Sequence, residues 1–450
     1  MSRGLLLLIL VVGSLASCRD PAPVDSEPRL FVVVDMPPLT SDRASTGGIS
    51  FADIDRDGDP DVYVTNGYDV SSEAPTAQAN RFYENLQGRY EARAIEGLTD
   101  LQGFSSGSVW LDFDNDGDLD TFIANQRDQE NALLLQKAAE DSGFRFASSA
   151  ASLLAEDKGW SYSVAAADAD NDGYVDIYVS NGGLSHSGVN FLYRNIEGTH
   201  LQRILNTDAV DSEHASGGAS WSDYDGDGDQ DLVVANRPTA EMDGYKLSLF
   251  RNDGDLKFTR MDENALPVDA TFPMSVAWGD VDNDGDQDLY AGSLYGMANS
   301  LYENLGNGTF EIMDGGRATS DGSSSYAVAF GDLDNDADLD LVVANWGGTS
   351  EIYINDGAGY FDQTLSAVFE RSITFAGSMA MGDFDSDGDL DILIGNWPNQ
   401  PGDGEENVLI ENRYADGNWL KVALEGVSSN RSAIGARITV EFTKDGTTRS

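Results

Sequence analysis

Aspartates recur along this chain in a nine-residue pattern, Asp-x-Asp-x-Asp-Gly-Asp-x-Asp or a near copy, that occurs seven times. The copies begin 51 to 59 residues apart, a spacing too regular for chance acidic turns. Carboxylates at positions 1, 3, 5 and 9 are hard oxygen ligands, so each copy is predicted to be a calcium loop. The predicted ligands, in chain order, are Asp53, Asp55, Asp57 and Asp61; Asp112, Asp114, Asp116 and Asp120; Asp168, Asp170, Asp172 and Asp176; Asp223, Asp225, Asp227 and Asp231; Asp280, Asp282, Asp284 and Asp288; Asp332, Asp334, Asp336 and Asp340; and Asp383, Asp385, Asp387 and Asp391.

Loop five shows how such a nonamer would hold a cation. Gly285 at position 6 permits the sharp turn that brings Asp280, Asp282 and Asp284 together, because glycine tolerates positive φ. Position 7 is expected to ligate through its backbone carbonyl, and Asp288 through both carboxylate oxygens. The result is the six to eight oxygens that Ca²⁺ prefers, rather than the rigid octahedron of Mg²⁺.

Three copies depart from the pattern without losing a side-chain ligand. Tyr174 stands at position 7 of loop three, where only the backbone oxygen is needed, and Pro60 stands at position 8 of loop one. Ala337 replaces the glycine of loop six, where a left-handed alanine should cost about 1 kcal/mol. Loop six is therefore predicted to be the weakest site.

Short β-rich runs must position these loops. A run of small and apolar residues, such as 274–279, precedes each loop, and a second run, such as 288–293, follows it. A third run (300–304) and, after a glycine-rich hairpin, a fourth (309–312) complete the unit. Four short strands per unit are typical of a β-propeller blade, so the predicted fold class is all-β. Six second runs end in an asparagine, which suits a turn: Asn66, Asn125, Asn181, Asn236, Asn345 and Asn396.

The two ends of the repeat array complement each other. The seventh unit runs through residues 407–412 and lacks an ordinary fourth strand, whereas an unattached β-rich run, residues 30–35, precedes the first loop. This N-terminal run is predicted to complete the seventh blade and close the ring, which removes the exposed sheet edges of an open array. Tryptophans two residues before three of the loops are predicted to pack between blades: Trp110, Trp221 and Trp278.

The repeated motif, followed by Leu and then by Ala-Asn or Thr-Asn, resembles the FG-GAP/VCBS repeat family of calcium-binding propellers over residues 30–414. Residues 418–440 resemble the opening of the ASPIC/UnbV domain, which follows such propellers in cartilage-acidic-protein-like secreted proteins. That resemblance stops at Ser450, within an expected β-hairpin. We therefore expect a seven-bladed propeller over residues 29–414, closed by an N-terminal strand, and an incomplete small β domain over residues 417–450.

The charge balance is strongly acidic, with 78 acidic and 27 basic residues and a formal net charge of −51. Seven Ca²⁺ ions would add 14 positive charges and leave a net of −37. Nucleic acid is therefore excluded as a partner, because phosphate binding needs a basic face. Without metal, each loop would hold like charges together, so calcium is expected to stabilise the fold. We expect a monomeric propeller.

The N-terminus has the form of an export signal. Arg3 precedes an apolar run, residues 5–12, that is too short to span a bilayer. Residues 15–18, Leu-Ala-Ser-Cys, resemble a bacterial lipobox, which implies a signal peptide over residues 1–17 and a lipidated Cys18 at the start of an 18–28 tether. Arg19 favours the outer membrane or cell surface over inner-membrane retention. The alternative is an ordinary signal peptide and a secreted protein.

Catalytic residues are not predicted. The three histidines, His186, His200 and His214, form no metal-ligand spacing, and no nucleophile motif or glycine-rich phosphate loop occurs. Trp346 and Trp397 follow strand-ending asparagines, in loops on one face of the ring, and are candidates for ligand contact. Exposed aromatic rings there could stack on sugars or hold a protein partner.

Two classes of function follow. The first is a calcium-rigidified, non-enzymatic module for adhesion or for binding a protein or glycan at the cell surface. The second is a polysaccharide lyase or hydrolase built on a calcium-stabilised propeller, because fold alone does not separate the two. An enzyme would need a clustered acid and base, and the aspartates in excess are assigned to calcium. The sequence favours the binding module.

Overall fold

The structure is a computed structural model that describes residues 31–67, 77–139, 143–149, 157–182, 186–211, 213–237, 246–267, 271–365, 375–397, 405–414 and parts of 422–449. The predicted signal peptide, the tether and Cys18 lie outside the described residues. Within the described residues, the helical elements are the turn η2 (Asp208–Val210) and the short α1 (Arg317–Ser320). No helix in this part of the chain is long and apolar enough to cross a membrane.

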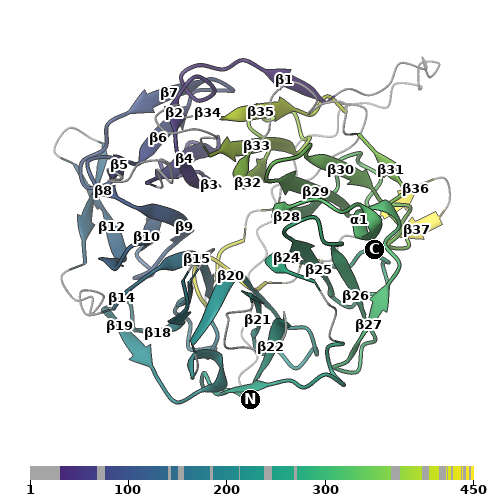
Figure 1. The fold of residues 1–450 in the computed structure, drawn as a ribbon. Coiled ribbons are helices and arrows are strands. Elements are labelled where there is room, and N and C mark those ends of the chain that lie inside the picture. The colour runs from purple at the N-terminus through teal and green to yellow at the C-terminus, as the bar shows by residue number, and fades with distance from the viewer. Residues whose placement is uncertain are drawn as a thin grey trace.

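Seven antiparallel sheets of four main strands surround a common axis, which confirms the predicted all-β propeller (Figure 1). The first strand of each blade lies nearest the axis and is rich in small residues, because the next blade packs directly on it. A Cβ added at Gly47, for example, would lie 2.4 Å from the backbone oxygen of Ser105 in the neighbouring blade. The inner strands are β3 (Thr46–Ala52), β9 (Ser105–Leu111), β15 (Ser161–Ala167), β20 (Glu213–Ser222), β24 (Pro273–Gly279), β28 (Ser325–Gly331) and β32 (Ala376–Gly382).

The second strand of each blade begins at the last aspartate of a loop and runs to the opposite face of the ring. Its described side chains are buried because neighbouring blades cover both of its faces. These strands therefore carry near-continuous apolar runs rather than an alternating pattern. They are β4 (Asp61–Asn66), β10 (Asp120–Asn125), β16 (Asp176–Asn181), β21 (Asp231–Arg237), β25 (Asp288–Ser293), β29 (Asp340–Asn345) and β33 (Asp391–Asn396).

The third strand of each blade returns toward the loops, and several of these strands end at an asparagine beside the second-strand aspartate. They are β6 (Arg81–Asn85), β12 (Ala132–Ala138), β18 (Phe191–Ile196), β22 (Lys246–Asn252), β26 (Ser300–Asn304), β30 (Glu351–Ile354) and β35 (Val408–Glu411). The outer strands of blades one to six complete the sheets. They are β7 (Tyr90–Arg93), β13 (Phe144–Ser148), β19 (His200–Ile204), β23 (Phe258–Arg260), β27 (Phe310–Met313) and β31 (Gln363–Thr364).

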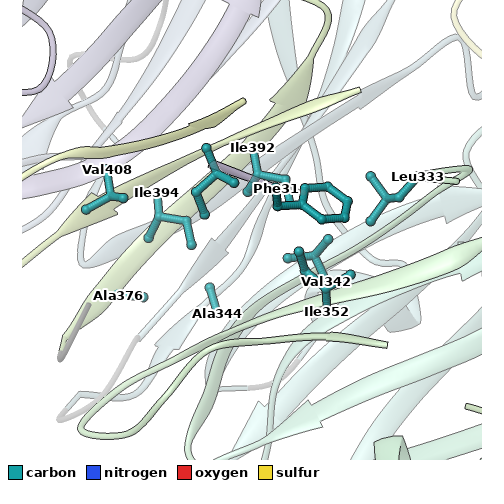
Figure 2. Close-up of a cluster of buried hydrophobic side chains, with 10 residues drawn as sticks. Phe31, Leu333, Val342, Ala344, Ile352, Ala376, Ile392, Ile394 and Val408 are labelled. Carbon is teal, nitrogen blue, oxygen red and sulfur yellow. The ribbon is translucent and has the colours of Figure 1, made fainter. Parts of the chain in front are cut away.

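The N-terminal strand closes the ring, as predicted. β1 (Val32–Val34) pairs antiparallel with β35, with Val33 opposite Ile410, and supplies the outer strand of blade seven. Phe31, 5% exposed, packs in the core between blades six and seven with residues such as Leu333 and Val342 (Figure 2). The first strand of the chain thus lies beside the last blade.

Short two-stranded ribbons join neighbouring blades on the face opposite the loops. They are β2 (Arg43–Ala44) with β34 (Glu405–Glu406), β5 (Gln78–Ala79) with β8 (Gln102–Gly103), β11 (Gln129–Glu130) with β14 (Lys158–Gly159), and β17 (Gly188–Val189) with β20.

The three in-register tryptophans pack between blades, as predicted. Trp110 contacts Tyr63 edge to face at 5.4 Å between ring centroids. Trp278 stacks with Tyr224 at 6.3 Å, and Trp221 lies 6.2 Å from Tyr178. Each pair joins consecutive blades. Beyond the propeller, β36 (Phe442–Lys444) and β37 (Thr447–Arg449) form the expected hairpin.

Candidate metal centres and the opposite face

All seven aspartate loops connect a first strand to a second strand, so they lie on one face of the ring, here called the metal-loop face. The acidic side chains converge there. Among the described residues, seven groups of at least three possible metal-ligating side chains bring their ligand atoms within 4.8 Å of one another. Five of these groups belong to loops one to five: Asp53, Asp55 and Asp57; Asp112, Asp114 and Asp120; Asp168, Asp170 and Asp172; Asp223, Asp225 and Asp231; and Asp280, Asp282 and Asp288.

Two left-handed residues shape each loop. Position 6 has φ between 94° and 100° in the six glycine loops and 75° at Ala337. Position 4 is left-handed in all seven copies as well, for example Asn283 at φ 60°, which the sequence pattern did not single out. Asparagine and glycine tolerate this conformation best, and they fill five of the seven copies.

Backbone N–H groups then orient the carboxylates. The N–H of position 6 donates to the first aspartate in every loop, at 2.9 to 3.1 Å. The N–H of position 7 donates to the third aspartate, at 2.9 to 3.0 Å. Neither bond depends on which side chain stands at position 7. Tyr174 therefore fits loop three without distorting it.

The last aspartate of each loop is buried and held by two backbone donors. In loop five, Asp288 accepts the N–H of Val281 through Oδ2 at 3.0 Å and the N–H of Asn304 through Oδ1 at 2.9 Å. The same pair of bonds recurs in the other six loops. Each carboxylate oxygen keeps a second lone pair that could bind a cation. Asp288 thus has a structural role beyond the predicted bidentate one.

The burial of these aspartates is costly without a cation. Burial raises the pKa of Asp61, Asp120 and Asp288 to about 7, and nearby carboxylates of the same loop add to the rise. Burial likewise raises the pKa of Asp231, Asp340 and Asp391 to about 8. A divalent ion would offset both the desolvation and the repulsion between carboxylates.

Every loop also holds a buried carboxylate oxygen without a hydrogen-bond partner in the described structure. Such an orphaned acceptor costs about 1–3 kcal/mol, more when charged, unless something else satisfies it. A cation at the centre of the loop would do so, so the residues present fit a calcium ion. These oxygens belong to Asp53, Asp112, Asp168, Asp223, Asp280, Asp334 and Asp385.

Comparison with known families agrees with this arrangement. The FG-GAP-like repeat profile matches residues 112–179, 223–291, 287–343 and 332–394, together more than half of the chain. The chain belongs to the FG-GAP-like repeat family. The FG-GAP matches begin or end within the aspartate loops and their flanking strands, so the family signature and the metal-loop face coincide.

The FG-GAP propeller is also similar to cartilage acidic protein 1. It is 27% identical to the Mus musculus protein over 317 residues, covering 64% of this chain and 48% of that protein. It is 26% identical to the Homo sapiens protein over 316 residues, covering 64% and 47%. The chain spans about half the length of the curated relatives it matches. Among solved structures, the crystal structure of BBS1N in complex with ARL6DN, soaked with lead, aligns with a TM-score of 0.51 at 11% identity, covering 87% of this chain and 99% of that one, which supports the fold alone.

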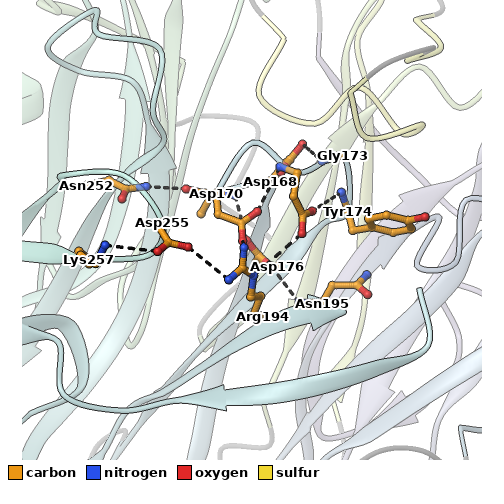
Figure 3. Close-up of polar contacts among 12 residues, drawn as sticks. Asp168, Asp170, Gly173, Tyr174, Asp176, Arg194, Asn195, Asn252, Asp255 and Lys257 are labelled. Carbon is orange, nitrogen blue, oxygen red and sulfur yellow. Dashed lines mark hydrogen bonds and ion pairs between the residues drawn. The ribbon is translucent and has the colours of Figure 1, made fainter. Parts of the chain in front are cut away.

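A protein cation enters loop three of the FG-GAP propeller. Arg194, from the third strand of the same blade, lies 2.5 Å from Asp170 Oδ2 and 3.3 Å from Asp255 of the next blade (Figure 3). Burial and the neighbouring Asp172 carboxylate still raise the pKa of Asp170 to about 6. A metal ion in loop three would compete with this guanidinium.

Loop two meets residues from beyond the FG-GAP propeller. Ser432 Oγ accepts the backbone N–H of Asp112 at 2.9 Å, and the N–H of Arg431 donates to Asn115 Oδ1 at 3.1 Å. The Arg431 guanidinium lies 3.7 Å from Asp112 Oδ2. The segment with the ASPIC/UnbV-like sequence therefore lies against the metal-loop face, a contact that local sequence spacing does not reveal.

The opposite face, here called the aromatic face, holds the two tryptophans singled out from the sequence. Trp346 and Trp397 contact each other at 5.1 Å between centroids, and Tyr326 lies within 6 Å of both. Trp397 is only 3% exposed, so the expectation of an exposed loop ring is wrong at this position. Trp397 belongs to a buried cluster that also contains Met274 and Leu294 of blade five.

Other aromatic residues surround this cluster. The residue that precedes the start of inner-strand pairing is aromatic in four blades: Phe104, Trp160, Phe272 and Phe375. Tyr295 is 65% exposed and lies edge to face on Phe272 at 4.7 Å. His186 stacks on Trp160 at 3.5 Å, and burial lowers its pKa.

Proposed function

We propose that this chain is a calcium-binding, non-enzymatic binding module whose seven metal loops stiffen the ring and whose aromatic face contacts the partner. The buried carboxylate oxygen left without a hydrogen bond in each of the seven loops is the observation that carries the calcium assignment. Six to eight oxygen ligands suit Ca²⁺, and aspartate carboxylates with backbone carbonyls can supply them.

The proposed binding surface combines stacking rings with amide groups. A pocket of about 500 Å³ lies on the aromatic face between the first three blades. Asn80, Gln102, Asn125 and Gln129 line it, together with Lys158. The amides of this pocket, and exposed rings elsewhere on the aromatic face such as Tyr295, suit a sugar ring or the polar surface of a protein. A glycan or protein at the cell surface is thus the proposed partner, and the net charge of −51 argues against nucleic acid.

A binding screen tests this surface. The calcium-loaded chain would be screened against glycans and secreted proteins, with analysis of soluble products. We expect the chain to bind its partner without cleaving it. Tyr295→Ala should weaken this binding by about tenfold or more, as for an interface anchor. Tyr360→Ala is the matched control, because Tyr360 is 41% exposed but lies in a hairpin on the metal-loop face. Release of glycan fragments would favour the lyase or hydrolase alternative.

We also propose export and a lipid anchor at Cys18 on the outer membrane or cell surface, with secretion as the alternative. The apolar run followed by Leu-Ala-Ser-Cys supports it. Fatty-acid labelling of the expressed protein tests the anchor. Label should be incorporated by the parent and lost in Cys18→Ser, and a chain released into the medium without label would indicate secretion.

A further inference from the structure

A buried amide at the end of each third strand joins two metal loops. Asn252 of blade four is one example (Figure 3). Its backbone N–H donates to Asp231 of loop four at 2.8 Å, and its side chain donates to the carbonyl of Ala169 in loop three at 2.7 Å. The N–H of Ala169 in turn donates to Asp176, the last aspartate of loop three, at 3.1 Å. One side chain therefore links the final aspartates of two neighbouring loops.

The same connection occurs at all seven blade interfaces. Asn85 carries it across the ring closure by donating to the carbonyl of Phe384 in loop seven at 2.8 Å. Gln136 of blade two makes the longest contact, 3.5 Å to the carbonyl of Ile54. The hydrogen bonds thus form a closed circuit through the seven loops. The bridging residues are Asn85, Gln136, Asn195, Asn252, Asn304, Asn355 and Asn412, all of them buried.

A second, more exposed set of contacts links the same loops. The residue at position 4 of one loop reaches position 7, or the adjoining carbonyl, of the next loop along the ring. The pairs are Arg56 with Asp118, Asn115 with Gly173, Asn171 with Asp229, Asn283 with Asp338, Asn335 with Asp389, and Ser386 with Asp59. Loop four has Gly226 at this position, which has no side chain to make the contact with loop five.

We infer that the seven loops bind calcium cooperatively, because each buried amide transmits the ordering of one loop to the final aspartate of the next. The inference rests on the proposed calcium binding. A cation in loop four would draw in Asp231 and fix the backbone of Tyr224, whose N–H donates to that carboxylate at 3.3 Å. The Tyr224 carbonyl holds the Asn304 side chain at 2.8 Å, and the Asn304 N–H orients Asp288 of loop five at 2.9 Å. Buried hydrogen bonds are strengthened by the low local dielectric, which favours such transmission.

Loops four and five offer the cleanest test, because Gly226 leaves the buried amide as the described side-chain hydrogen bond between them, beside the stacking of Tyr224 on Trp278. Asp223→Ala would disable loop four, and hydrogen exchange of peptides covering residues 280–288 would report calcium protection of loop five during a titration. In the parent chain we expect Asp223→Ala to raise the calcium midpoint of loop five at least fivefold, a typical coupling between sites. In an Asn304→Leu background, Asp223→Ala should shift the calcium midpoint of loop five less than twofold.

Two further variants keep the result interpretable. Asn304→Gln retains an amide, as Gln136 does in blade two, and should keep part of the coupling. Asn299→Leu removes an equally buried asparagine at the opposite end of blade five, 3% exposed, and should leave the coupling intact. A loop-five midpoint that ignores Asp223→Ala would overturn the cooperativity. Coupling that survives Asn304→Leu would overturn the role of the amide, whereas no calcium protection in any loop would instead refute the proposed calcium binding.

Discussion

On the metal-loop face every blade presents the same nine-residue loop, whereas on the aromatic face neighbouring blades present different residues. Phe104, Trp160 and Phe272 stand where other blades have Ser45 or Ser324. Repetition suits a face with one chemical task performed seven times. Variation suits a face that must match the shape of a single partner, because a hot spot needs only a few well-placed anchors. In the proposed function, the two faces separate stability from recognition.

Calcium removal should produce the largest effect and should act on the metal-loop face. Each filled site adds about 2.7 kcal/mol to the free energy of unfolding when free calcium exceeds the Kd of the site a hundredfold. Chelator should therefore lower the Tm substantially in calorimetry, and magnesium should restore little because it keeps its waters. Identical melting curves with chelator and with millimolar calcium would show that calcium does not stabilise the metal-loop face.

Deleting residues 29–36 should open the ring and disturb both faces together. The deletion removes β1 and the buried Phe31, whose loss alone costs about 3–5 kcal/mol, and it exposes the edge of β35. Aggregation or a large fall in Tm is expected in light scattering and thermal unfolding. Deleting residues 19–27 is the control and should change neither. Equal behaviour of the two deletions would contradict closure by the N-terminal strand.

Within loop five, Asp288→Ala should reduce both stability and calcium binding more than Asp286→Ala does. Asp288 is buried and accepts two backbone N–H groups, so its loss leaves two donors unpaired at about 1–3 kcal/mol each, in addition to one lost calcium. The backbone carbonyl of Asp286 survives its substitution. Calorimetric titration should find one site fewer in the first variant only. An equal loss of calcium sites in both variants would show that the assignment of calcium ligands is wrong in every loop.

Arg194→Met should tighten loop three, because it removes a guanidinium that competes with the metal ion. A partly exposed ion pair is worth about 0.2–1 kcal/mol, so we expect up to a fivefold gain in calcium affinity at that loop. Arg251→Met is the matched control. Arg251 precedes Asn252 as Arg194 precedes Asn195, but it pairs with Asp253, outside the loop ligands, at 2.7 Å. A similar gain in both variants would show that net charge alone is responsible.

Ala337→Gly should give a similarly small gain, at loop six. Ala337 has φ 75°, a region that glycine enters without strain, so the change should stabilise the loop by about 0.5–1 kcal/mol. Peptide-level hydrogen exchange would show a lower calcium midpoint for residues 332–340. Gly388→Ala in loop seven, where φ is 98°, should have the opposite effect. Unchanged midpoints in both would show that the ligands alone set the affinity.

Most of the metal-loop face could be predicted from the sequence, because each loop is built from residues within nine positions of one another. The fold followed from the same spacing, and ring closure followed from the extra strand before the first blade and the strand missing from the last one. Asn304 lies beside Tyr224 because adjacent blades pack there, at a separation of 80 residues. No local pattern specifies that contact. Its only sequence signal is the recurrence of asparagine after the third strand, as in Tyr302-Glu303-Asn304.

The aromatic face was harder to predict for a related reason. The inward position of Trp397 depends on the rings of Tyr326 and Trp346, which belong to blade six. Likewise, Arg431 lies beside Asp112 although 319 residues separate them in the sequence, so only the packing of distant segments brings them together. Both features arise from the packing of distant segments, and neither leaves a periodic trace in the sequence.

Closure by the first strand also fixes an order of events during synthesis. Arg43 pairs with Glu406 and β1 with β35, across separations of more than 360 residues, so the first propeller strand must wait for the last propeller strand. Contacts of such long range form slowly because loop closure precedes any gain. The individual blades and their nine-residue loops need no such wait. A growing chain therefore passes through an open arc of finished blades, and its completion is a single late event that joins both ends at once.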